Sequence, residues 1–192
     1  MQKLVLASSS PYRKSLLERL RQPFECASPD IDETPQPGET AEQLTQRLAR
    51  TKAQTLRSRF SDHLIIGSDQ VLLLDGEPVS KPLSHAAAVD QLTRSSGRTL
   101  TFSTALCVLN SANGHEQTCI EPVHVTFRDL SPEEIERYLQ LEQPYDCAGS
   151  FKSEGLGITL IARIQGNDPT SLIGLPLIRL RAMLANEGLN LP

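Results

Sequence analysis

The sequence predicts an α/β protein with a mixed, partly antiparallel twisted sheet and flanking helices. Segments with strand and helix patterns alternate along the chain, and no internal repeat or long linker interrupts them. Asn113-Gly114 is in addition a strong signal for an antiparallel hairpin. With 192 residues, 39% of them hydrophobic, the chain is long enough for a substantial buried core. We therefore expect residues 1–192 to form a single domain.

The first expected elements are a strand, a helix and a second strand. Residues 3–7 are mostly apolar and fit a buried strand. Ser8-Ser9-Ser10 then forms a polar turn, and Pro11 suits the first position of a helix over 11–20. A short strand is expected over 24–27. The chain therefore begins as a strand–turn–helix unit with a serine-rich junction.

The next segment predicts a long helix and then a strand interrupted at an acidic residue. Thr40, with a glutamine three residues later, fits a capping box that opens a helix to about Phe60. Residues 64–67 form a compact apolar run, and the apolar pattern resumes over 71–74. Asp69 is thus expected at the end of a strand, between two apolar runs.

The remaining elements continue the alternation. A helix follows Pro82, two strands flank the Asn-Gly turn, and Ser131 with Glu134 forms a second capping box. The expected helices cover 84–95, 131–141 and 176–186, and the expected strands cover 98–109, 117–127 and 158–164.

Composition and charge exclude several classes of protein. A formal net charge of -4 and an aromatic content of 4% argue against nucleic-acid binding, which needs phosphate neutralisation and stacking platforms. No apolar run approaches membrane-spanning length and no signal-peptide core is present, so we expect a cytoplasmic protein without membrane contact. The four cysteines and four histidines are too scattered for a zinc site or a disulfide framework.

Carboxylates in two segments are candidate metal ligands. Asp69 follows Gly67-Ser68 at an expected strand end, where open α/β sheets often bind ligands. A carboxylate there could equally bond to nearby backbone amides. Asp32 and Glu33 add hard oxygen ligands of the kind that phosphoryl chemistry uses. Both interpretations of Asp69 remain open on spacing alone.

Positively charged and hydroxyl groups are candidate phosphate ligands. The segment from Ser8 to Arg13 combines hydroxyls, backbone N–H groups at a helix start and a guanidinium. It fits an anion cradle, although such a turn is also an ordinary helix cap. Lys52 and Lys81 add point charges that could neutralise a polyphosphate.

Taken together, these segments resemble the Maf family of nucleotide pyrophosphatases. The resemblance runs through nearly the whole chain, and its motifs occur in the order of the family. They are Leu6-Ala7-Ser8-Ser9-Ser10-Pro11-Tyr12-Arg13, Asp30-Ile31-Asp32-Glu33, Ala49-Arg50-Thr51-Lys52-Ala53, Gly67-Ser68-Asp69-Gln70-Val71, Ser80-Lys81-Pro82, Ala148-Gly149, Ser153-Glu154-Gly155 and Ile173-Gly174-Leu175-Pro176-Leu177.

The resemblance implies an inosine-triphosphatase-like fold with two lobes around a central cleft, and a homodimer. It also implies hydrolysis of the α–β phosphate bond of a nucleotide with Mg²⁺ or Mn²⁺ as the divalent cofactor. The implied roles are triphosphate binding by Ser8, Arg13, Lys52 and Lys81, metal binding by Glu33 and Asp69, and orientation or deprotonation of water by Asp69.

Three departures from the commonest family pattern bear on the base. Tyr12, Gln70 and Glu154 are similar to the YceF-type branch, which implies binding of 7-methyl-GTP. Methylation at N7 makes the guanine ring cationic, which favours a facing carboxylate such as Glu154 and a stacked aromatic ring such as Tyr12. Two alternatives remain: a pyrophosphatase for dTTP, UTP or other modified nucleotides, and a nucleotide-binding regulator of cell division and septum formation.

Overall fold

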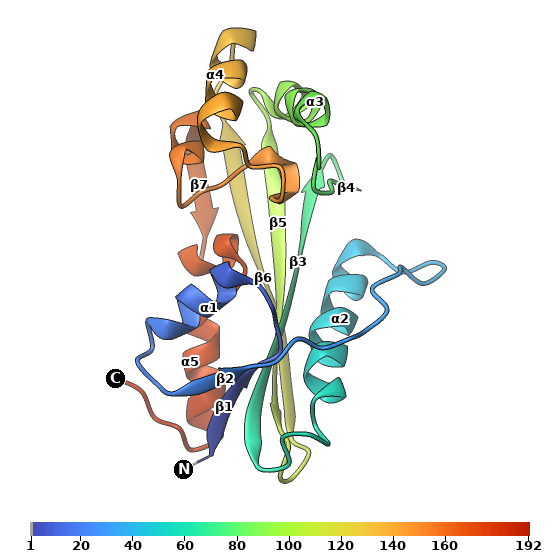
Figure 1. The fold of residues 1–192 in the computed structure, drawn as a ribbon, viewed down its shortest axis with the longest axis vertical. Helices are drawn as coiled ribbons and strands as arrows, with labels where there is room; N and C mark the ends of the chain where they lie inside the picture. The colour runs from blue at the N-terminus through green and yellow to red at the C-terminus, as the bar shows by residue number, and fades with distance from the viewer. Residues whose placement is uncertain (1) are drawn as a thin grey trace. The chain divides into compact units, whose positions relative to one another are not determined.

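The computed structural model describes residues 2–192 and confirms the α/β class. Within these residues a seven-stranded sheet has the order β2-β1-β3-β5-β6-β7, with β4 paired beside β3 (Figure 1). The strands are β1 (Lys3–Leu6), β2 (Phe24–Cys26), β3 (His63–Leu74), β4 (Glu77–Pro78), β5 (Thr99–Asn110), β6 (Glu116–Phe127) and β7 (Ile161–Gly166). The α-helices are α1 (Pro11–Glu18), α2 (Ala41–Thr55), α3 (His85–Ser95), α4 (Pro132–Glu142) and α5 (Leu177–Asn186), and the short 3-10 helices are η1 (Ala148–Ser150), η2 (Leu156–Leu160) and η3 (Pro169–Ile173).

The sheet is mixed, as predicted. β1 runs parallel to both β2 and β3, whereas β4 is antiparallel to β3 and β7 is antiparallel to β6. The pairing of β1 with β3 ends at Leu6 opposite Ile66, so the later residues of β3 extend beyond the end of β1. No helix within residues 2–192 has the length and apolar character needed to cross a bilayer.

The chain forms two compact units. The first unit comprises the residues up to Gln70, residues 104–121 and residues 168–192, and the second comprises residues 71–103 and 122–167. Strands β3, β5 and β6 contribute residues to both units. The single domain expected from the sequence stays a prediction.

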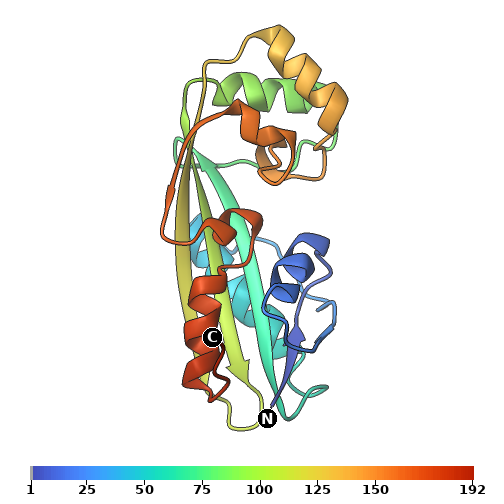
Figure 2. The same cartoon turned by 90° about the vertical axis from the view of Figure 1, so that its left-hand side faces the viewer.

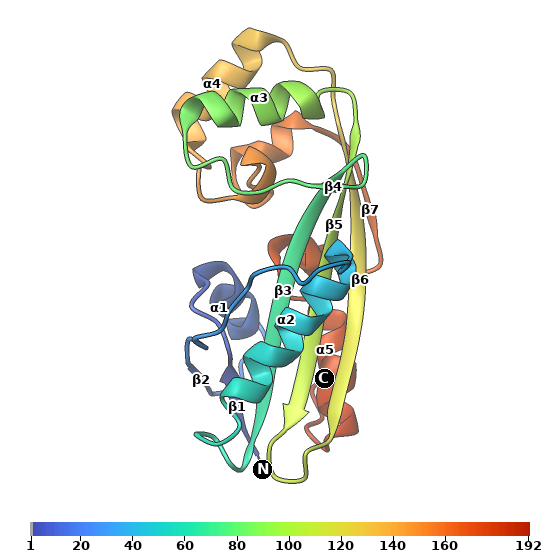
Figure 3. The same ribbon diagram turned by 90° about the vertical axis from the view of Figure 1, so that its right-hand side faces the viewer.

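Two apolar layers cover opposite faces of the sheet in the first unit. Alternate residues of a strand point to opposite faces, and α2 packs on one face whereas α1 and α5 pack on the other (Figures 1 and 3). Even-numbered β3 residues such as Ile66 lie with α1 and α5, and the odd-numbered Ile65 lies with α2. Both faces of these strands are therefore buried, which explains their nearly continuous apolar sequence.

In the second unit, α3 and α4 pack together (Figure 2). Phe151 lies edge-on to Phe127, with ring centroids 5.4 Å apart, and 6.1 Å from the ring of Phe102. These aromatic contacts tie the segment after η1 to strands β5 and β6.

Local capping decides the helix starts that the sequence predicted. The Ser10 side chain accepts a hydrogen bond from the Arg13 N–H with Pro11 at the first helical position. The Thr40 and Ser131 capping boxes are both present. The helix expected to reach Phe60 ends at Thr55, however, and the residues after it form turns.

Two predicted strands are wrong in their limits. The strand expected over 158–164 begins only at Ile161, because residues 156–160 form η2, whose first N–H is bound by the Glu142 carboxylate at 2.6 Å. The expected break between 67 and 71 is absent, since β3 is continuous from His63 to Leu74. Asp69 therefore lies within a strand and not at its end, although it lies beyond the end of the neighbouring β1.

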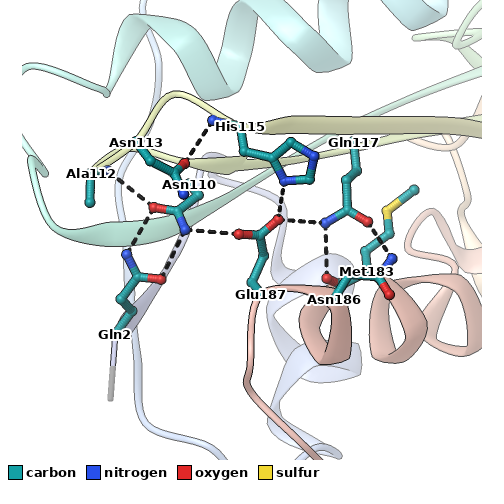
Figure 4. Close-up of polar contacts among 9 residues, drawn as sticks. All are labelled: Gln2, Asn110, Ala112, Asn113, His115, Gln117, Met183, Asn186 and Glu187. Carbon is teal, nitrogen blue, oxygen red and sulfur yellow. Dashed lines mark hydrogen bonds and ion pairs between the residues drawn. The ribbon is translucent and has the colours of Figure 1, made fainter.

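A buried carboxylate anchors the end of α5. The side chain of Glu187 is 5% exposed and accepts hydrogen bonds from Asn110, His115 and Gln117 at 2.8, 2.5 and 2.8 Å (Figure 4). Asn110 in turn bonds to Gln2 at the start of the chain. A negative charge is unfavourable at a helix C-terminus, so these donors must compensate it. The network joins the β5–β6 turn to both ends of the first unit.

We expect Glu187→Gln to lower the free energy of unfolding by about 1–3 kcal/mol, because its amide would turn a donor towards buried donors. Burial alone raises the pKa of Glu187, but the hydrogen bonds from Asn110 and His115 outweigh it and hold the pKa below the ordinary value of 4.5. The stabilisation by the ionised form is thus complete above pH 4.5 and is lost as the pH falls towards the folded-state pKa.

Urea unfolding at neutral pH and at about pH 3.5 measures this effect. The difference in the free energy of unfolding between wild type and Glu187→Gln should be smaller at the lower pH. Glu25→Gln, at an exposed position on β2, is the matched control. A difference that is equal at the two pH values would contradict the role of the charge.

Candidate active site

Two carboxylates meet at one buried ammonium group in the first unit. Lys52 Nζ lies 2.6 Å from Asp69 Oδ1 and 2.8 Å from Glu33 Oε1. The side chains of Lys52 and Asp69 are 9% and 16% exposed, whereas that of Glu33 is 58% exposed. The three residues come from α2, β3 and the loop after β2. This cluster places three predicted site residues in direct contact.

Close packing of α2 on β3 makes the contact between Lys52 and Asp69 possible. Gly67 has no side chain, and a Cβ placed there would lie 2.1 Å from the Ala49 carbonyl oxygen and 3.1 Å from the Ala53 nitrogen. Lys52 is on the same turn of α2 as these two alanines. Asp69, two residues after Gly67, points to the same face of the strand and so reaches the helix.

Arg13 lies near this cluster on the first turn of α1. Its Nε donates to the Gly174 carbonyl oxygen at 2.9 Å, which fixes the guanidinium. Burial lowers the pKa of Arg13, and the charges of Asp69 and Glu33 oppose that shift. Its positive charge therefore acts on the same two carboxylates that Lys52 contacts.

Burial also raises the pKa of Asp69, against the opposing effects of Lys52 and Arg13. The carboxylate is thus less stabilised by its surroundings than an exposed one, despite a direct ion pair. Additional positive charge beside it would favour the ionised form. Such a group is suited to bind a cation or to take up a proton from water.

Ser8 occupies the turn between β1 and α1. The residue is 7% exposed, and its Oγ accepts a hydrogen bond from the Ser10 N–H at 3.1 Å. Ser10 itself is the N-cap of α1. The serine-rich turn therefore caps α1. The N–H groups at the start of this helix and the side chain of Arg13 belong to the same short segment.

The other face of β3 carries Ser68 and Gln70. Ser68 Oγ lies 2.9 Å from the carbonyl oxygens of both Ala105 and Gly174. Gln70 Nε2 donates to Thr104 Oγ1 and to carbonyl oxygens of the segment 168–174. Ser68 and Gln70 thus point away from α2, as the period of the strand requires.

The segment 168–174 is the main contributor that sequence reasoning missed. Asp168 is 1% exposed, and its carboxylate accepts hydrogen bonds from the N–H groups of Thr170 and Ile178. These bonds join η3 to the first turn of α5, and the carbonyl oxygen of Gly174 then holds Arg13 and Ser68. The motif Ile173-Gly174-Leu175-Pro176-Leu177 is the available signal, but its residue types alone indicate no role.

For four predicted residues, no contact described here joins them to the Lys52 cluster. Lys81 and Glu154 are exposed residues of the second unit, and Glu154 accepts a hydrogen bond from Ser153 Oγ at 3.1 Å. Tyr12 is half-buried on α1. Asp32 is exposed and accepts a hydrogen bond from the Thr34 N–H, which accounts for its orientation. The roles of Lys81, Glu154 and Tyr12 stay predictions.

The Glu33 and Asp69 carboxylates fit a divalent cation bound together with substrate. Among residues 2–192 no three His, Cys, Asp or Glu side chains gather into a ready-made metal site. Mg²⁺, however, is usually held by one or two carboxylates with water and phosphate oxygens completing its shell. Two carboxylates that converge on a single ammonium, one of them with a raised pKa, supply that donor set.

A family model matches almost the whole of this chain. A family model described as Maf-like protein matches residues 3–187. Among solved structures, the Ham1 protein of Staphylococcus aureus is 18% identical with a TM-score of 0.47, covering 67% of this chain and 73% of that chain. The nucleoside-triphosphatase (dITP/XTP pyrophosphatase) of Mycobacterium abscessus is 20% identical with a TM-score of 0.44, covering 66% of this chain and 74% of that chain.

Proposed function

Because this chain belongs to the Maf family and is a nucleoside triphosphate pyrophosphatase, we propose that its substrate is 7-methyl-GTP. Hydrolysis between the α- and β-phosphates releases 7-methyl-GMP and pyrophosphate. The observation that carries the site assignment is the ammonium of Lys52, which bonds to Asp69 at 2.6 Å and to Glu33 at 2.8 Å. A cation held between two carboxylates is suited to a negatively charged phosphate chain and its counterion.

The residues of this cluster have distinct tasks in the proposed reaction. Asp69 Oδ1 is bound by Lys52, so Oδ2 remains to orient water at the α-phosphorus and to accept its proton. Lys52 and Arg13 neutralise the charge that develops on the departing pyrophosphate. A bound Mg²⁺ or Mn²⁺ supplies further neutralisation of the phosphate oxygens. The family resemblance names Lys81 as a further candidate ligand of the triphosphate.

The choice of base is supported by the residue types at three positions. Glu154 is an exposed carboxylate, and a cationic 7-methylguanine ring is attracted to such a group. Tyr12 offers an aromatic face for stacking. Gln70 adds an amide whose Nε2 is fixed by a hydrogen bond to Thr104 Oγ1. Hydrolysis of 7-methyl-GTP would remove a modified nucleoside triphosphate from the nucleotide pool. We propose that the protein does this in the cytoplasm and as a homodimer.

A nucleotide panel tests the proposal. We expect equal amounts of monophosphate and pyrophosphate from 7-methyl-GTP, with turnover lost on addition of EDTA and restored by Mg²⁺ or Mn²⁺. GTP, dTTP and UTP are the comparison substrates. Faster turnover of dTTP or UTP would contradict the proposed substrate, release of single phosphate would contradict the split between α and β, and tight binding without product would favour a regulator.

Glu154→Gln should lower kcat/KM for 7-methyl-GTP by about tenfold and leave kcat/KM for GTP within about twofold. The reason is that the variant loses the charge that distinguishes the methylated, cationic ring from the neutral one. Steady-state kinetics on both substrates measures the ratio. Glu142→Gln would disturb the nearby turn, so Glu133→Gln, at an exposed position on α4, is the better control. An equal loss of kcat/KM on both substrates would contradict a role for the charge of Glu154.

A further inference from the structure

The amide of Gln70 is held in one orientation by three oxygen atoms. Nε2 lies 2.8 Å from Thr104 Oγ1, 2.8 Å from the Ser171 carbonyl oxygen and 3.2 Å from the Leu172 carbonyl oxygen. All four residues belong to the first unit. Carbonyl oxygens only accept hydrogen bonds, so two of the three neighbours require a donor.

Thr104 is also unable to donate to Gln70. Its hydroxyl donates to the Ser171 carbonyl oxygen at 2.8 Å, which leaves only its lone pairs for the glutamine. Thr104 is fully buried and Ser171 is fully buried, so water does not substitute for either partner. A flipped amide would place Oε1 against three acceptors, which is costly at a buried site.

The amide oxygen is consequently the group that Gln70 presents to its surroundings. Oε1 accepts no hydrogen bond from residues 2–192, while the side chain as a whole is half-buried. Gln70 follows Asp69 directly and lies beyond the end of β1. A hydrogen-bond acceptor without a protein donor, next to the reacting carboxylate, is suited to an N–H group of the substrate.

We infer that Thr104 is a positioning residue for base selection: together with the segment 168–174 it fixes Gln70 Oε1 as an acceptor that requires a ring N–H donor on the base. The inference rests on the proposed function in that a nucleotide base occupies this site. The chemical class selected is a lactam or imide base, with guanine N1–H or uracil N3–H as the donor. Adenine N1 and cytosine N3 lack a hydrogen and would face Oε1 as a second acceptor.

The wild-type protein provides the first test. We expect replacement of the N1 hydrogen by methyl, from 7-methyl-GTP to 1,7-dimethyl-GTP, to lower kcat/KM by at least about a hundredfold, because a buried acceptor then lacks its donor. If the panel shows UTP to be the preferred nucleotide, the same comparison is made between UTP and 3-methyl-UTP. In that case the proposed substrate fails, and the inference holds if 3-methyl-UTP shows the same loss of kcat/KM and is overturned if it does not. Preference for ATP or CTP would overturn the inference.

Substitution of Thr104 provides the second test. Thr104→Val keeps the shape but removes the hydroxyl, so the amide is less well fixed, and we expect KM for the preferred nucleotide to rise by about five- to tenfold with kcat nearly unchanged. The same substitution should change kcat/KM for the N-methylated nucleotide by less than about twofold, because that substrate makes no bond to Oε1. Thr104→Ser retains the hydroxyl and should restore most of the loss.

The outcomes separate positioning from a general structural role. A loss that is equal for both nucleotides, or that falls on kcat alone, would overturn the role of Thr104, as would a failure of Thr104→Ser to restore KM. Thermal unfolding of each variant shows whether it is folded. Should Thr104→Val not fold, the comparison of methylated and unmethylated bases with the wild-type protein decides the inference on its own.

Discussion

Asp69→Asn is expected to lower kcat/KM for pyrophosphate release by at least about a thousandfold. Asparagine keeps the shape and can still accept a hydrogen bond from Lys52, but it removes the negative charge and the site of proton uptake. Because Lys52 also pairs with Glu33, the ammonium would keep one partner. Additional Mg²⁺ should not restore activity.

The stability of Asp69→Asn should change little. Burial raises the pKa of Asp69, so the folded protein tolerates the loss of this charge better than the loss of a fully stabilised carboxylate. Thermal unfolding should shift by only a few degrees. Asp90→Asn, an exposed change on α3, is the control and should keep activity within about twofold. More than a tenth of wild-type activity in Asp69→Asn would remove Asp69 from the chemistry.

Gly67→Ala is expected to lower the free energy of unfolding by about 3 kcal/mol and to remove most activity. The added methyl would lie 2.1 Å from the Ala49 carbonyl oxygen, a backbone atom that cannot move without shifting α2. Since α2 also carries Lys52, its displacement would separate Lys52 from Asp69. The loss of stability thus comes from a steric clash at position 67, and the loss of activity comes from the broken ion pair between Lys52 and Asp69.

Gly38→Ala is the matched control for this prediction. A Cβ at Gly38 would meet nothing within 4 Å, and only its positive φ of 76° opposes the substitution. We expect a cost of about 1 kcal/mol and no loss of activity. Urea unfolding and pyrophosphate release measure both variants. Equal stability losses would show that the close approach of α2 is not what requires glycine at position 67.

Helix starts were predictable because a few neighbouring residues decide them. Ser10 and Pro11 at the start of α1, and Thr40 at the start of α2, act through bonds within their own turn. The end of α2 was not predictable to the same degree, since apolar residues continue past Thr55 into turns that pack against the sheet. Packing and not local preference sets that boundary.

The continuity of β3 depends on contacts with segments that are distant in the sequence. Ser68, Asp69 and Gln70 are polar and looked like a break, yet each finds a partner on α2, β5 or the segment 168–174. The pair of Arg13 and Gly174 is separated by 161 residues in sequence. No local pattern indicates such a contact, so the segment 168–174 could be recognised as a motif but not placed.

The residues of the Lys52 cluster can nevertheless be predicted from the sequence without knowledge of their contacts. Their residue types, two carboxylates and a lysine, are those that phosphoryl chemistry uses, and the family resemblance selected them from many similar residues. Spacing alone left Asp69 open between a functional and a structural interpretation. The structure brings Glu33, Lys52 and Asp69 into contact, and their catalytic roles stay predictions for the experiments above.

The alternation of side chains along β3 has an evolutionary consequence. Position 69 belongs to the face that meets α2, and position 70 belongs to the opposite face. Substitutions on the face that meets the segment 168–174 can therefore change which nucleotide is accepted while Lys52 and Asp69, on the face that meets α2, are kept. A strand of this kind would allow an ancestral hydrolase to change its range of substrates without a change in its hydrolytic mechanism.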